Sequence, residues 1–135
     1  MIEPRPAVRR FAASVVGAAI ARGDDVQAIT ARLRESLSDL VGAAGFDVLL
    51  GRSLVLARRV HPFLAAVAPG ADGALTGLDK GLDLASVEQG TVTIVSHFVE
   101  LLAVLIGEDL ALHLVRDVWP EARDMTSAPP KDEKE

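Results

Sequence analysis

The segment SVEQGTVTIVSHFVELLAVLI, residues 86–106, decides the fold. If it is helical, apolar side chains occur on nearly every side of it: Val92, Ile94, Val95, Phe98, Val99, Leu101, Leu102, Val104 and Leu105. A helix that is apolar all round is buried in a protein core or crosses a membrane. His97 and Glu100 interrupt the run before it reaches the ~20 uncharged residues of a membrane span. We therefore expect a central buried helix and no membrane span.

Four more helices are expected around this central one. Apolar residues recur at spacings of three and four in residues 6–22, 26–41, 46–60 and 108–118, and glycine or proline ends each run. Ser86 and Gln89 have the spacing of a capping box at the start of the central helix. The sequence predicts an all-α fold, a five-helix orthogonal or up-down bundle around residues 86–106.

The chain has the length of one domain. We assign residues 1–120 to a single helical domain and residues 121–135, which are polar and contain Pro129 and Pro130, to a disordered tail. Residues 69–83 alternate glycines with leucines, which predicts a loop that packs onto the bundle. On the first helix Ala13, Gly17 and Ala21 are four residues apart, which is typical of tight packing in the core.

Charge is distributed unevenly along the chain. Residues 1–60 carry nine arginines against six acids, whereas residues 61–135 carry five basic residues against thirteen acids. The two halves therefore have net charges of +3 and −8. Opposite charges favour docking of the halves within one molecule and head-to-tail association between molecules.

Few residues are candidates for catalysis or metal binding. The absence of cysteine excludes disulfides and thiolate sites. His97 and Glu100 lie three apart on one face of the central helix, but a di-metal bundle needs such a pair on two helices and further acids. We interpret them as a buried polar pair and expect no metal, no cofactor and no enzymatic activity.

Nucleic-acid binding is a weaker alternative. Residues 26–60 could form a helix-turn-helix with Arg52, Arg58 and Arg59 on its second helix. The start of that helix is Phe46-Asp47-Val48, which lacks base-reading side chains, and the protein is acidic overall. We therefore expect no nucleic-acid partner.

The first 21 residues resemble a signal peptide in part. Arg9 and Arg10 precede an apolar run from Phe11 to Ile20, and Ala19-Ile20-Ala21 has the small residues of a cleavage site. Arg22 follows at once and the run is short, so we expect a cytoplasmic protein and leave export as the alternative.

The function is inferred mainly by elimination. We expect a non-catalytic interaction module, a small regulatory or adaptor protein that forms a homodimer and binds another protein. The candidate interface residues are Arg58, Arg59, His61, Phe63 and Trp119. The alternative is a bundle that binds a small apolar ligand between the last three helices, with residues 69–83 as its lid.

Overall fold

Five α-helices make up most of the chain in this computed structural model, which describes residues 4–70, 72–78 and 83–122. They are α1 (Pro6–Arg22), α2 (Ile29–Val41), α3 (Ala43–Val60), α4 (Leu84–Ile106) and α5 (Glu108–Val118). The 3₁₀ helices η1 (Val26–Ala28) and η2 (Pro62–Ala66) precede α2 and follow α3. The strands β1 (Ala68–Pro69) and β2 (Leu75–Thr76) form a short antiparallel pair. The predicted all-α bundle is confirmed.

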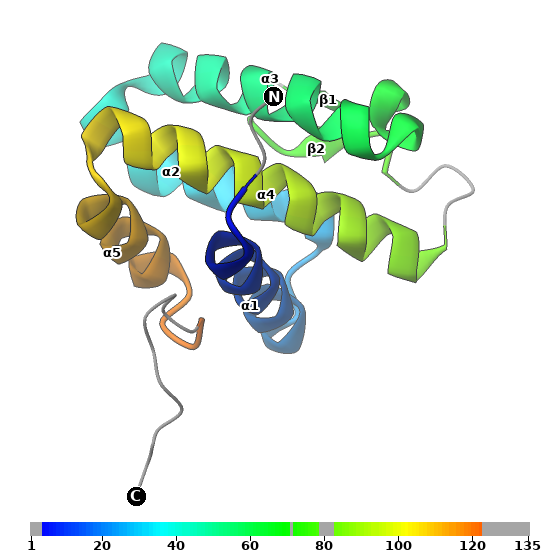
Figure 1. The fold of residues 1–135 in the computed structure, drawn as a ribbon, viewed down its shortest axis with the longest axis horizontal. Coiled ribbons are helices and arrows are strands. Elements are labelled where there is room, and N and C mark those ends of the chain that lie inside the picture. Colours follow the sequence, from blue (N-terminus) through cyan, green and yellow to red (C-terminus); the bar gives the residue numbers. More distant parts are fainter. Residues whose placement is uncertain (1–3, 71, 79–82, 123–135) are drawn as a thin grey trace, which may run out of the picture.

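Helix α4 is the central element, with α1, α3 and α5 packed against it (Figure 1). Most of its residues from Val87 to Leu102 are buried. The helix begins two residues earlier than expected, because the carboxylate of Asp83 accepts hydrogen bonds from the backbone N–H and the hydroxyl of Ser86. The prediction of Ser86 as the cap was therefore wrong.

The pairing of α3 with α4 is antiparallel. The rings of Phe46 and Phe98 lie 5.1 Å apart between their centroids, and Nε2 of His61 lies 3.0 Å from the Thr93 hydroxyl. Phe46 lies in the first turn of α3 and Phe98 in the second half of α4, so α3 begins beside the later part of α4. The α2–α3 and α4–α5 turns consequently lie at the same end of the molecule (Figure 1).

Each of these two turns consists of one glycine. Gly42 ends α2 and precedes α3, and Gly107 ends α4 and precedes α5. Their φ angles are 80° and 95°, in the left-handed region that residues with a Cβ atom rarely adopt. The glycines thus allow two sharp turns without a loop.

The segment between η2 and α4 packs onto the bundle where it is described. Leu75 and Leu78 are buried, and the Thr30 hydroxyl donates a hydrogen bond to the Gly73 carbonyl. The expectation of a packed loop is confirmed for residues 72–78, while Gly81 and Leu82 lie outside the described residues. The segment that we expect to act as a lid is thus held to α2 by the Thr30 hydrogen bond, and its strand β2 contacts η1.

Helix α1 buries its larger apolar side chains and leaves its strip of small residues exposed. Its larger side chains, Val8, Phe11, Val15 and Val16 among them, fill the core side of the helix. Ala13, Gly17 and Ala21 are exposed, and a Cβ atom placed on Gly17 would meet nothing within 4 Å. The predicted tight core packing of these small residues is therefore wrong, because the bulkier residues beside them occupy the core.

Ion pairs join the basic first half of the chain to the acidic second half. Arg5 pairs with Glu100 and Glu108, and Arg22 pairs with Glu121. Glu121 and the buried Ala122 therefore contact the bundle, and the prediction that the tail begins at residue 121 is wrong for these two residues. The remainder of the predicted tail, residues 123–135, lies outside the described residues.

Candidate interaction surfaces

Large aliphatic side chains are exposed at the end of the molecule where the two glycine turns lie. This apolar end consists of one or two residues from each of α2, α3, α4 and α5: Leu40, Val48, Val104, Leu105 and Leu110. Val104 is 85% exposed and Leu105 is 60% exposed, although both belong to the core helix. Clustered exposed apolar side chains mark interaction sites more often than isolated ones do.

The charges beside the apolar end are negative. Residues 35–51 and 101–115, which form this end, contain Glu35, Asp39, Asp47, Glu108 and Asp109 and neither lysine nor arginine. Asp47 is paired with Arg34 and Glu108 with Arg5, while Asp39 and Asp109 are exposed. A partner with basic residues around an apolar strip would match this surface.

A groove of about 360 Å³ separates α1 from the first turns of α4. The α1 wall contains the small residues Ala13 and Gly17 and the half-exposed Ile20, and the α4 wall contains Ala85 and Val92. Its polar residues are Arg9 on α1 and Glu88 and Gln89 on α4. The groove lies away from the site between α3, α4 and α5 that we had expected for an apolar ligand.

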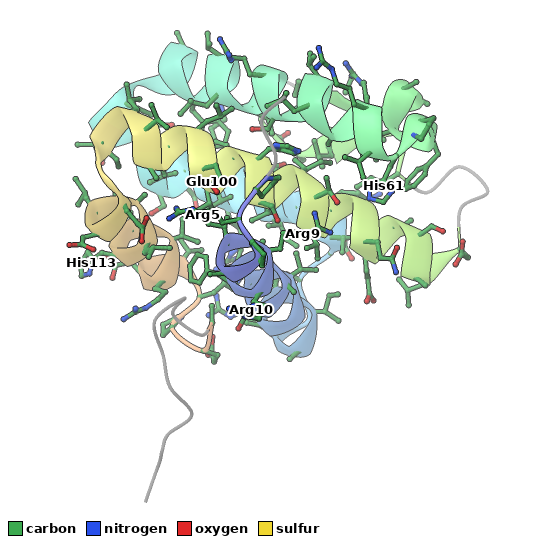
Figure 2. All side chains as sticks on the ribbon, in the orientation of Figure 1. Arg5, Arg9, Arg10, His61, Glu100 and His113 are labelled. Carbon is green, nitrogen blue, oxygen red and sulfur yellow. The ribbon has the colours of Figure 1, made fainter. Side chains whose placement is uncertain are left out.

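Glu100 accepts hydrogen bonds from Arg5, which lies 95 positions earlier in the sequence. The Arg5 backbone N–H and guanidinium donate to the carboxylate at 2.9, 3.1 and 3.2 Å (Figure 2). Partial burial raises the pKa of Glu100, but the hydrogen bonds from Arg5 outweigh it and the net pKa is below its usual value. His97 is buried one turn earlier, and its electrostatic interaction with Glu100 also lowers the Glu100 pKa.

Three of the predicted interface residues have structural partners. The guanidinium of Arg58 donates to the carbonyls of Leu64 and Val67, and thereby holds η2 against α3. His61 meets Thr93 of α4, and the half-buried Phe63 packs against the core beside Gly90. Burial lowers the pKa of His61, and the nearby charge of Arg9 lowers it further.

The other two predicted interface residues, Arg59 and Trp119, differ in their exposure to solvent. Arg59 is exposed near the end of α3. Trp119 is completely buried, and its indole N–H points to the Asp24 carboxylate at 3.4 Å. The assignment of Trp119 to a surface is therefore corrected: the chain after α5 folds back, so the indole fills the core instead of facing solvent.

The part of the chain that the structure describes contains no metal-binding cluster and one long apolar helix. No group of three or more His, Asp or Glu side chains there could hold a metal ion. Helix α4 is long and apolar enough to cross a membrane by length and composition, but 56% of the relevant window is buried inside the protein. The core helix of a soluble bundle has the same properties.

Comparisons with protein-family models, with curated proteins and with solved structures gave no match to this chain.

Proposed function

We propose that the protein is a non-catalytic interaction module that self-associates and binds a helical segment of another protein at its apolar end. The observation that carries the proposal is the exposure of Val104 and Leu105 in the last turn of α4. Burial of apolar surface contributes a favourable free energy of about 25 cal/mol for each Å² removed from water, and these exposed side chains do not gain it in the isolated protein. A partner that covers this end would recover that free energy.

The charges favour one kind of partner. An amphipathic helix docks with its apolar face on a hydrophobic surface, and its flanking residues decide specificity. Because Asp39 and Asp109 are exposed beside the apolar side chains, a partner helix flanked by lysine or arginine is favoured over an acidic one. An anionic membrane surface would be repelled by the same two carboxylates.

Binding of a defined peptide tests the proposal. The probe is a synthetic 18-residue amphipathic helix with leucines on one face and lysines on its flanks, labelled for fluorescence anisotropy. We expect saturable binding, which Val104→Ser weakens by about tenfold because one desolvated apolar contact is lost. The same peptide with glutamate in place of lysine should bind at least about tenfold more weakly.

A matched variant controls for general loss of surface hydrophobicity. Val60 is 50% exposed at the opposite end of α3, so Val60→Ser removes a similar side chain far from the proposed site. Equal weakening by Val60→Ser and Val104→Ser would contradict the assigned surface. Equal binding of the lysine and glutamate peptides would contradict the proposed partner chemistry.

A further inference from the structure

The groove between α1 and α4 is open although its lining is largely apolar. Its floor contains Val16, and its sides contain Ala13, Gly17, Ile20 and Val92. Because nothing lies within 4 Å of a Cβ atom on Gly17, a second helix has room to approach the α1 backbone closely there. The groove therefore has the shape to accept a helix.

The charges of the groove differ between its two walls. The α1 wall carries Arg9, with the exposed Arg10 next to it in the sequence (Figure 2), whereas the α4 wall carries Glu88, with the exposed Asp83 just before the helix. Among the described residues neither Arg9 nor Glu88 takes part in an ion pair. A helix that brings arginine to the α4 wall would be electrostatically complementary to it.

Helix α1 itself meets both requirements of shape and charge. Its exposed face combines the small residues Ala13 and Gly17 with the arginines one turn earlier. If a second α1 lies antiparallel on the first, Ala13 of each copy faces Gly17 of the other. Arg9 and Arg10 of each copy then lie toward the other copy's Asp83 and Glu88. A parallel arrangement would instead place the arginines of the two copies together.

We propose that two copies of this chain associate through a two-fold symmetric interface in which α1 of each copy lies in the α1/α4 groove of the other. The inference rests on the self-association in the proposed function and assigns a surface to it. The acidic apolar end is a poorer site for a second copy, because two-fold packing there would bring like charges together.

A substitution that fills the groove is the first test. Light scattering coupled to size exclusion, and sedimentation velocity, measure the dimer dissociation constant of the full chain. We expect a dimer for the unchanged protein and a dissociation constant raised by about tenfold or more for Gly17→Leu, which separates the two helices. Gly51→Leu is the matched control, since a Cβ on Gly51 of α3 also meets nothing within 4 Å.

A charge exchange is the second test, and it does not place a side chain on a glycine. Arg9→Glu and Glu88→Arg should each weaken the dimer by about tenfold, and the double variant should regain most of the affinity. Circular dichroism verifies that each variant remains helical. Failure of the double variant to regain affinity would overturn the proposed contact between these two residues.

Further outcomes separate this inference from the proposed function. A monomer at millimolar concentration, or a dimer abolished by Leu105→Ser and unaffected by Gly17→Leu, would overturn the groove as the interface. Val104→Ser should leave the dimer intact, and Gly17→Leu should leave binding of the lysine-flanked peptide intact. Loss of peptide binding alone would contradict the proposed function and not the dimer.

Discussion

Glu100 shows how one residue connects distant parts of the chain. Its carboxylate accepts from Arg5, 95 positions earlier, and Arg5 also pairs with Glu108. Arg5 is the residue that precedes α1, so this contact fixes the start of α1 against α4 and α5. Sequence reasoning found Glu100 but paired it with His97, because helical spacing reports neighbours on one helix and no contacts between helices.

Removal of the Glu100 charge should change the acid sensitivity of folding. The folded-state pKa of Glu100 is lowered, so its contribution is present above the unfolded value of about 4.5 and is lost as pH falls through the lower folded value. We expect Glu100→Gln to lower the free energy of unfolding by on the order of 1 kcal/mol at pH 7. The free energy of unfolding of this variant should also fall less steeply as the pH is lowered. Urea denaturation at pH 7, 4 and 3 measures this.

The exposed Glu35 of α2 supplies the control, since it belongs to no described ion pair. Glu35→Gln should leave both the stability and its pH profile nearly unchanged. An unchanged acid profile in Glu100→Gln would show that the contact with Arg5 is energetically neutral.

His61 should titrate below the usual histidine value of about 6.5. Burial disfavours its charged form and the charge of Arg9 adds to this, so neutral His61 is favoured in the fold. Its contribution to stability is present above pH 6.5 and is lost as pH falls through the lowered folded-state pKa. NMR titration of its ring protons in the unchanged protein and in Arg9→Gln measures both effects.

We expect the Arg9→Gln variant to raise the His61 pKa while leaving it below 6.5, because burial is the larger cause. A value at or above 6.5 in the unchanged protein would contradict the described burial.

At the scale of the element, α4 combines a buried middle with an exposed end. The apolar pattern of residues 86–106 predicted the central position correctly, since neighbouring helices cover most of its apolar side chains. The same pattern predicts that the other helices cover α4 on every side, and this prediction is wrong for the last turn of α4. Pattern alone does not report where the neighbouring helices end, and here α5 turns away directly after Gly107.

Two leucines on α4 test this difference. Leu102 is completely buried, whereas Leu105 is 60% exposed. Leu102→Ala should destabilise the protein by about 2–5 kcal/mol through lost burial and a cavity. Leu105→Ala should change stability by less than about 0.5 kcal/mol, since it alters a surface position. Urea denaturation of both variants measures the free energy of unfolding, and similar losses would contradict the exposure of the last turn.

The predicted interface residues also show the limit of pattern-based prediction. The roles of Arg58 and Trp119 depend on carbonyls and a carboxylate that reach them only after the chain folds back. Amphipathic side chains near a helix end look identical in sequence whether they face solvent or a neighbouring segment. The sequence therefore predicted the C-terminal ends of the helices well, missed three of their starts by two or three residues, and did not identify the apolar end or the α1/α4 groove.

For the whole molecule, the packing of α1, α3 and α5 on α4 predicts cooperative unfolding. Trp119 is the protein's single tryptophan and lies in the core, so its fluorescence reports on docking of the α5 end. We expect urea transitions followed by fluorescence and by circular dichroism at 222 nm to coincide. Separate midpoints would show that the α5 end dissociates before the other helices unfold.

The glycine turns have a consequence for binding. Gly42 and Gly107 join their helices through single residues, so the side chains flanking them are carried on rigid helices and not on loops. A partner at that end would meet a surface already fixed in shape, and little conformational entropy would be lost on association. Added residues at either turn should therefore weaken recognition by loosening a preorganised corner, even where every contacting side chain is retained.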